Sequence, residues 1–220
     1  MTTTTEKVTP LRLEDWGTLD YTEAFSRQDK MVLDLQQQRI IDTLVLVQHP
    51  QVVTLGRRGS EADLRCPAES FTASGVALQH INRGGLATAH EPGQLVAYPI
   101  VQLKRKDLRW FANTFLQVVV SVLADFGVEG YLKEGEPGVW VHNRKICSFG
   151  IAVKKWISSH GIALNVNNNL ETFKMIIPCG RAEENVTSLA CELGHELNMA
   201  EVKERFVQHF LHVFAYQLKD

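Results

Sequence analysis

Three runs of residues decide the fold that this sequence predicts: GVWVHNRKICSFGI (Gly138–Ile151), SSHGIALNVN (Ser158–Asn167) and IIPCG (Ile176–Gly180). Apolar residues alternate with polar or small ones in the first two runs, which is the spacing of half-buried β-strands. The predicted strands are Val139–Val141, Ile146–Val153 and Ile162–Val166. A tight turn at Asn143-Arg144 is expected to join the first two strands.

Lys145 and Cys179 are the residues of this region that carry chemistry. The predicted turn puts Lys145 at the start of the second strand. Cys179 follows the third strand on a Pro-Cys-Gly turn, where a side chain can be presented rather than packed. The two residues can therefore meet at one end of a sheet. Each also has an ordinary interpretation, because most turn lysines are solvated and most lone cysteines are buried.

The rest of the chain alternates further strands with three long helices. The helices are predicted from the capping residues Asp20, Asp107 and Asn198, each followed by an apolar stripe at helical spacing. Thr43–Val47 and Val52–Leu55 are nearly apolar throughout, which predicts an internal pair of strands in a sheet. Two more strands are expected at residues 76–82 and 95–101. The pattern predicts an α+β fold, with a mixed β-sheet flanked by helices.

Composition argues against several classes of partner. The chain has 220 residues, of which 45% are hydrophobic and 22% charged, and its formal net charge is −2. This balance gives no reason to expect nucleic acid or a membrane as a partner. The start of the sequence lacks the apolar core of a secretory signal. We expect a cytoplasmic monomer with reduced thiols, with a flexible tail over residues 1–9 and a single domain over residues 10–220.

A glycine-rich stretch, NRGGLATAHEPGQLV (Asn82–Val96), is the second informative region. Paired glycines after a strand let the backbone approach a ligand and adopt positive φ angles. Their N–H groups, together with Arg83, can hold an amide, a carboxylate or a phosphate. Most Arg-Gly-Gly runs are nevertheless plain turns, and this one matches neither the Gly-x-Gly-x-x-Gly nor the Walker pattern.

Several motifs together resemble one family, the lipoyl(octanoyl) transferases of the biotin/lipoate protein ligase superfamily. The loop from Arg83 to Gln94, with Tyr98-Pro99 after it, is similar to the signature loop of that family. Further blocks that agree in type and order are His49-Pro50, Thr54–Arg57, Gly138–Val141, Lys145–Ile151, His160–Val166, Pro178-Cys179-Gly180 and Val186–Leu189. The resemblance covers roughly residues 10–190. It implies a biotin/lipoate protein ligase-like fold, a mixed sheet lined by helices, with a tunnel for an acyl chain.

The resemblance implies an acyltransferase that moves an octanoyl group from octanoyl-acyl carrier protein to a lysine of lipoyl domains, the first step of protein lipoylation. The implied acceptors are lipoyl domains of 2-oxoacid dehydrogenases and the H protein of glycine cleavage. One catalytic domain would suffice, without ATP, a cofactor or a metal. Two alternatives stay open: an ATP-dependent lipoate or biotin protein ligase, which activates its acid as an adenylate, and a non-catalytic acyl-binding module.

The same resemblance implies roles for individual residues. Cys179 would be the nucleophile that carries the octanoyl group as a thioester, and Lys145 would favour its thiolate and then act as acid and base. Small residues would leave room for the chain, and backbone N–H groups could hold the developing oxyanion. The implied substrate-binding residues are Arg83, Gly84, Gly85, Leu86, Ala87, Thr88, Ala89, His90, Ser148, Phe149, Gly150, Gly161, Ile162 and Ala163.

Three residues depart from the pattern of the family. Glu91 stands where the family usually has glycine, Ala89 where it has an aromatic residue, and Asn169 where aspartate is expected. Glu91 would place a negative charge in a loop that we expect to approach the carrier protein or the product. These departures bear on the shape of the pocket and leave Lys145 and Cys179 untouched.

Overall fold

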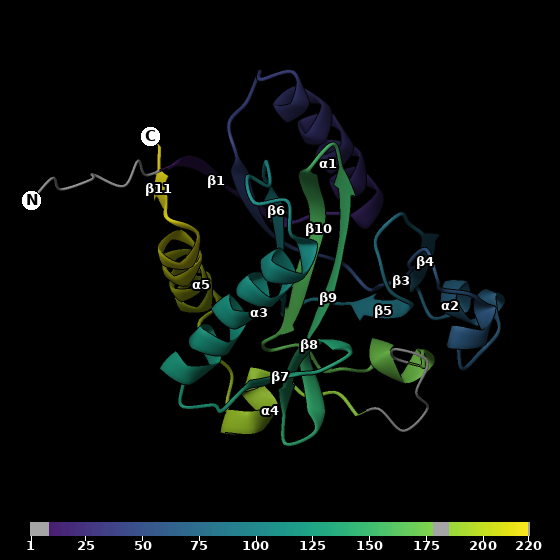
Figure 1. Cartoon of the computed structure of the whole chain (residues 1–220). Helices are drawn as coiled ribbons and strands as arrows, with labels where there is room; N and C mark the ends of the chain where they lie inside the picture. The colour runs from purple at the N-terminus through teal and green to yellow at the C-terminus, as the bar shows by residue number, and fades with distance from the viewer. Residues whose placement is uncertain (1–8, 178–184, 220) are drawn as a thin grey trace, which may run out of the picture.

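The computed structural model describes residues 9–177 and 185–219, and over these residues the strands form an eight-stranded and a three-stranded sheet (Figure 1). In spatial order the large sheet contains β11 (Tyr216–Leu218), β1 (Thr9–Thr18), β2 (Thr43–Gln48), β6 (Gln94–Ile100), β10 (Ile157–Asn165), β9 (Arg144–Lys154), β8 (Glu136–Val141) and β7 (Tyr131–Lys133). β1 pairs in parallel with β11 and β2, whereas the pairs from β2 to β7 are antiparallel. The expected mixed sheet is confirmed.

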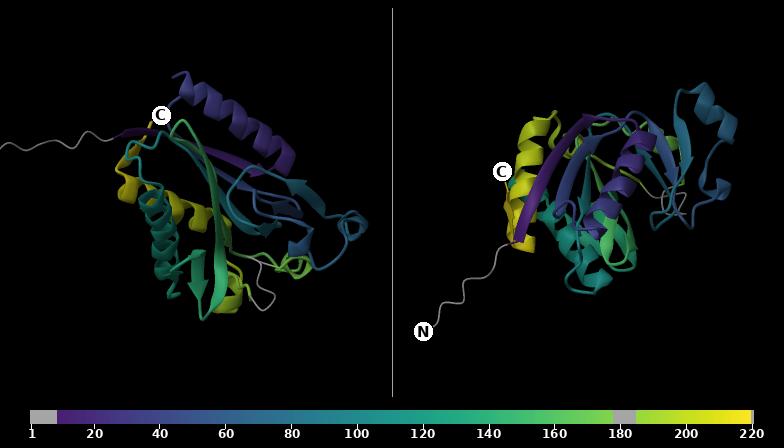
Figure 2. Two further views of the ribbon diagram at one scale, coloured as in Figure 1. Left: turned by 45° about the vertical axis from the view of Figure 1, so that its right-hand side comes forward. Right: turned by 90° about the horizontal axis from the view of Figure 1, so that it is seen from above.

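Helices cover both faces of the large sheet (Figure 2). They are α1 (Tyr21–Gln36), α3 (Leu108–Asp125), α4 (Leu189–Leu193) and α5 (Met199–Phe214). The side chains of alternate residues of β2 point to opposite faces of the sheet. Leu44 and Leu46 pack in the core with α3 and α5, whereas Val45 and Val47 pack in the core with α1. Because both faces are covered, β2 and β6 are apolar at most of their positions.

The three long helices begin where their capping residues predict. The side chains of Asp20, Asp107 and Asn198 each accept a hydrogen bond from a backbone N–H in the first turn of α1, α3 and α5. These bonds satisfy donors that have no partner within the helix itself. The starts of these helices are therefore confirmed.

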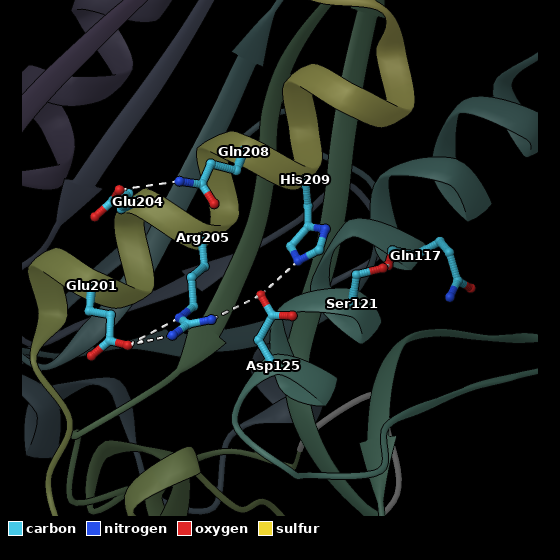
Figure 3. Close-up of polar contacts among 8 residues, drawn as sticks. All are labelled: Gln117, Ser121, Asp125, Glu201, Glu204, Arg205, Gln208 and His209. Atoms are coloured by element: carbon cyan, nitrogen blue, oxygen red, sulfur yellow. Dashed lines mark hydrogen bonds and ion pairs between the residues drawn. The ribbon is translucent and has the colours of Figure 1, made fainter.

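α3 and α5 pack together through aromatic rings on their inner side and charged groups on their outer side. The ring centroids of Phe115 and Phe210 lie 5.8 Å apart in the core. At the exposed edge, Asp125 Oδ2 lies 2.8 Å from His209 Nε2 and 3.6 Å from Arg205 Nη1 (Figure 3). The hydrogen bond from His209 lowers the pKa of the Asp125 carboxyl. His209 of α5 thus joins the two helices through Asp125 of α3.

The small sheet stands beside the large one and contains β4 (Ala77–His80), β3 (Val52–Leu55) and β5 (Ala87–His90) in that order (Figure 1). α2 (Ala68–Ala73) and the 3₁₀ turn η2 (Thr172–Met175) pack on it, and the 3₁₀ turn η1 (Glu61–Asp63) precedes α2. The prediction that β2 and β3 pair was wrong, because the chain leaves the large sheet at His49-Pro50. The glycine-rich stretch, expected to be a loop, contains β5, which pairs antiparallel with β3.

The hairpin between β8 and β9 turns one residue earlier than predicted. His142 and Asn143 have φ angles of 47° and 62°, so both occupy the left-handed region that a two-residue hairpin turn requires. The turn is therefore His142-Asn143 and not Asn143-Arg144. Lys145 is the second residue of β9, close to the predicted position at the start of that strand.

Replacing Gly161 with alanine is expected to destabilise the fold. A Cβ at this position in β10 would lie 2.0 Å from the backbone oxygen of Ala97 in β6. Neither strand can yield, because both are central in the large sheet, so we expect a loss of about 1–3 kcal/mol or more in the free energy of unfolding. Urea denaturation would measure it. Gly84→Ala is the control, since its nearest contact would be an ordinary 3.6 Å; equal losses in both variants would contradict the prediction.

Candidate functional site

A cavity of about 250 Å³ lies where the small sheet meets the large sheet. The predicted site residues that line it are Arg83, Gly85, Leu86, Ala87, Thr88, His90, Lys145, Ser148, Phe149, Gly150, Gly161, Ile162 and Ala163. Gly84 is not among the lining residues, and neither is Ala89, which is buried in the core of the small sheet. Cys179 lies outside the described residues. The structure thus brings together residues from three separate stretches of the sequence.

Arg83 braces the glycine-rich loop against β3. Its guanidinium donates to Thr54 O at 2.7 Å, to Thr54 Oγ1 at 2.8 Å and to Gly84 O at 2.9 Å, and the residue is 7% exposed. Gly85 has a φ angle of +92°, which favours glycine at this point of the loop. Arg83 therefore fixes the shape of the cavity wall and adds positive charge to it.

The glycines of β9 and β10 allow close backbone contacts and do not leave open space for an acyl chain. A Cβ on Gly150 would lie 2.9 Å from Gly84 O, so glycine there admits the loop of the small sheet. Gly161 pairs with Gly150 across the strands, and the space beside it is filled by Ala97 O. Nearby, Thr88 Oγ1 of β5 donates to Ser148 Oγ of β9 at 3.0 Å. These contacts lock the two sheets together around the cavity.

Lys145 is a buried lysine at the cavity wall and not a solvated turn residue. It is 3% exposed, and its Nζ lies 4.7 Å from the ring centroid of Trp140, a distance at which a cation is attracted to an aromatic face. Its backbone N–H donates to Asn185 O at 2.9 Å, and its O accepts from the N–H of Thr187 at 3.0 Å. Residues 185–187, which follow the Pro-Cys-Gly motif in the chain, therefore pack beside this lysine.

The three cysteines among the described residues are free thiols: Cys66, Cys147 and Cys191. Burial raises the pKa of the Cys147 thiol above its ordinary value, so this residue of β9 stays protonated in the core. Cys66 is half-buried against the core of the small sheet, and Cys191 is exposed on α4. None of these three cysteines lines the cavity.

A cluster of buried histidine and tyrosine rings lies at the cavity: Tyr21, His90, Tyr98 and His160 line it, and His49 packs against three of these rings. His49 Nε2 lies 2.8 Å from the Tyr98 hydroxyl, and the ring of Tyr21 stacks on His90 at 5.4 Å between centroids. His160 Nε2 lies 2.6 Å from Asn82 Oδ1. Tyr21 and Tyr98 line the cavity but were not among the predicted site residues. The signal that pointed to this region was the similarity of His49-Pro50 and Tyr98-Pro99 to the motifs of the family.

Burial keeps these rings uncharged at neutral pH. Burial lowers the pKa of His49 to about 4, and burial with the positive charges of Arg83 and Arg57 lowers the pKa of His160 to about 3. The pKa of His90 lies well below its ordinary value, chiefly through burial. The pKa of Tyr21 is raised to about 12 by burial. This wall of the cavity is therefore polar without carrying charge.

His160 holds an unusual backbone conformation within β10. Its φ angle is 56°, in the left-handed region that strand residues other than glycine rarely adopt. Its N–H donates to Gln28 Oε1 at 2.8 Å, and its ring is held by Asn82. Such strain persists only where neighbouring contacts hold it, and it is concentrated at functional sites. The conformation turns the His160 ring to the cavity.

Glu91 does not project from the loop as the sequence suggested. It is 1% exposed, and its carboxylate accepts hydrogen bonds from Asn168, Leu170 and Thr172. Asn169, the other polar departure from the family, is on the surface side, where its Oδ1 accepts from the N–H of Glu171 at 3.1 Å. Glu91 is thus part of the interior of the protein.

Among residues 9–177 and 185–219, no group of three or more His, Cys, Asp or Glu side chains is arranged to hold a metal ion. None of the helices described there has the length and apolar character needed to cross a membrane.

Comparison with known proteins identifies relatives of nearly the whole chain. A family model for the lipoyl protein ligase A/B catalytic domain matches residues 20–211. A protein named octanoyltransferase from Nitratidesulfovibrio vulgaris (strain DP4) is 42% identical over 205 residues, 92% of this chain and 94% of the relative. An octanoyltransferase from Solibacter usitatus is 38% identical over 208 residues, 94% of each protein.

Solved structures share the fold at much lower sequence identity. A lipoate protein ligase from Thermoplasma acidophilum superimposes with a TM-score of 0.77 at 16% identity, over 96% of this chain and 86% of that one. Identity this low supports a common fold and nothing about the reaction. The biotin/lipoate protein ligase-like fold expected from the motifs is confirmed.

The neutral histidines predict a loss of stability below about pH 6.5. An unfolded histidine titrates near 6.5, whereas the folded pKa values of His49 and His160 are about 4 and 3. As the pH falls, the unfolded state binds protons that the folded state does not, so each histidine lowers the free energy of unfolding by up to about 1.4 kcal/mol per pH unit.

Urea denaturation at pH 7 and pH 5 would measure this dependence. In His49→Gln, which keeps groups able to bond Leu19 O and the Tyr98 hydroxyl, the difference between the two pH values should shrink. An unchanged difference would show that His49 is not responsible.

Proposed function

This chain belongs to the lipoyl protein ligase A/B catalytic family, and we propose that it transfers an octanoyl group to a protein lysine through a thioester on Cys179. It is an acyltransferase, and octanoyl transfer serves protein lipoylation. The observation that carries the thioester route is the burial of Lys145 at the cavity wall, beside residues 185–187. The proposed partner of the Lys145 ammonium is the thiolate of Cys179, which comes shortly before residues 185–187 in the sequence.

In the first half-reaction, the Cys179 thiolate attacks the thioester carbonyl of the donor, octanoyl-acyl carrier protein. A free thiol has a pKa of roughly 8.5, so an adjacent ammonium raises the thiolate fraction at neutral pH. The new thioester bond forms as the donor C–S bond breaks, and Lys145 gives its proton to the departing thiolate. One thioester replaces another, so this exchange needs no ATP.

In the second half-reaction, the neutral amine of an acceptor lysine attacks the Cys179 thioester. Lys145, now neutral, takes the proton that the amine loses, and the Cys179 thiolate leaves. An amide bond forms as the C–S bond breaks, and the original thiolate and ammonium are restored. The proposed acceptors are lipoyl domains of 2-oxoacid dehydrogenases and the H protein of glycine cleavage.

The cavity suits an octanoyl chain because its walls carry aliphatic side chains and uncharged rings. Leu86, Ala87, Val96 and Ile162 provide apolar surface, and His160 contributes a neutral ring. Burying a chain against them removes apolar area from water without facing it with a desolvated histidine charge. We propose that the protein is a monomer that works in the cytoplasm, where thiols stay reduced.

Intact-mass spectrometry after incubation with octanoyl-acyl carrier protein, without ATP, tests this proposal. We expect a mass gain of one octanoyl group that hydroxylamine removes. Cys179→Ser should form no such thioester, and Lys145→Met should form it at least about a hundredfold more slowly, because proton transfer and thiolate stabilisation are both lost. Cys191→Ser, which removes an exposed thiol, should behave like the unaltered protein.

Three other results would contradict the proposed route. A labile adduct that survives in Cys179→Ser would place the nucleophile elsewhere. Transfer that requires ATP would favour an adenylate-forming ligase. Tight binding of the donor without any adduct would favour an acyl-binding module.

A further inference from the structure

Glu91 is a fully buried carboxylate that the proposed reaction does not use. It follows β5, and its Oε1 accepts from Asn168 Nδ2 at 2.9 Å and from the N–H of Leu170 at 2.7 Å. Its Oε2 accepts from the N–H of Thr172 at 3.0 Å. These three donors satisfy a charge that would be costly to bury alone. They also tie the start of η2 to the glycine-rich stretch, about 80 residues away in sequence.

The bonds of Glu91 continue through side chains to the cavity. Asn168 Nδ2 also donates to Asn165 Oδ1 at 3.1 Å, and Gln94 Nε2 donates to the same oxygen at 2.9 Å. Because the amide nitrogen of Gln94 is committed to that bond, its Oε1 accepts from His90 Nδ1 at 2.8 Å. His90 lines the cavity, so a continuous buried network runs from Glu91 to the cavity wall.

A second branch of this network leads to Lys145. Asn165 Nδ2 donates to Thr187 O at 2.9 Å, and the N–H of Thr187 donates to Lys145 O at 3.0 Å. The network therefore holds Thr172 on one side and Thr187 on the other side of the stretch that contains Cys179 in the sequence. Both anchor points are 1% exposed, so water does not compete for these bonds.

We propose that Glu91 is a positioning residue for octanoyl transfer, which fixes the chain on both sides of Cys179 relative to Lys145. The inference rests on the proposed function of Cys179. A carboxylate is suited to this place because both of its oxygens accept hydrogen bonds, and donors reach both oxygens. Glutamine has nearly the same shape but must turn its NH₂ group toward at least one of those donors.

The test compares Glu91→Gln with Glu171→Gln. Glu171 lies in the same segment, but its side chain is 56% exposed and forms an ion pair with Lys174 at the surface, so it is the matched control. Two rates are measured on each folded protein: octanoyl transfer from octanoyl-acyl carrier protein, and alkylation of Cys179 by iodoacetamide at pH 7.5, followed on its own peptide by mass spectrometry. The second readout requires no octanoyl donor.

For Glu91→Gln we expect a kcat at least tenfold lower with KM for the donor within about threefold, and Cys179 alkylation several-fold slower. Glu171→Gln should match the unaltered protein in both. Normal rates in Glu91→Gln, even with a lower Tm, would overturn the inference and leave Glu91 a purely structural group. If the unaltered protein forms no adduct while Glu91→Gln still slows alkylation, octanoyl transfer is refuted but the positioning of Cys179 stands. Glu91→Asp supplies the test should Glu91→Gln fail to fold.

Discussion

The cavity depends on the approach of two sheets through their backbones alone. Gly84 of the small-sheet loop donates its N–H to Ile151 O of β9 at 3.0 Å, and a Cβ on Gly150 would lie 2.9 Å from Gly84 O. A side chain at position 150 would hold the sheets apart. Once the backbones meet, Thr88 of the small sheet can reach Ser148 of the large sheet across the cavity wall. The cavity can therefore form only because glycine occupies position 150, whatever reactive groups line it.

Charge is distributed unevenly around this cavity. Lys145 and Arg83 bring cationic side chains to its walls, while burial keeps His49, His90 and His160 uncharged. The proposed reaction needs both environments, because a thiolate is favoured beside an ammonium and an acyl chain is favoured beside neutral groups. The interior network around Glu91 links Thr172 and Thr187, two described residues on either side of the segment that contains Cys179 in the sequence.

Local patterns predicted the parts of the fold that depend on local physics. Period-two alternation and capping residues located β8–β10 and the three long helices, and the motif blocks located Lys145 and the Arg83 loop. β1 was not predicted, because Leu11 is the one buried residue among its ten and the strand therefore has little hydrophobic alternation. The separation of β2 from β3 and the inward turn of Glu91 could not be predicted, because both are decided by partners far away in sequence, such as Thr172 for Glu91.

The parallel pairing of β1 with β11 has a consequence for synthesis of the chain. Thr9 pairs with Tyr216 and Leu11 with Leu218, so one backbone edge of β1 has no strand beside it until residues 216–218 have left the ribosome. Until then, the nascent sheet presents a row of open N–H and C=O groups that another chain can join. Exposed charges on β1, including Arg12 and Asp15, make such intermolecular pairing less favourable while the polypeptide is unfinished.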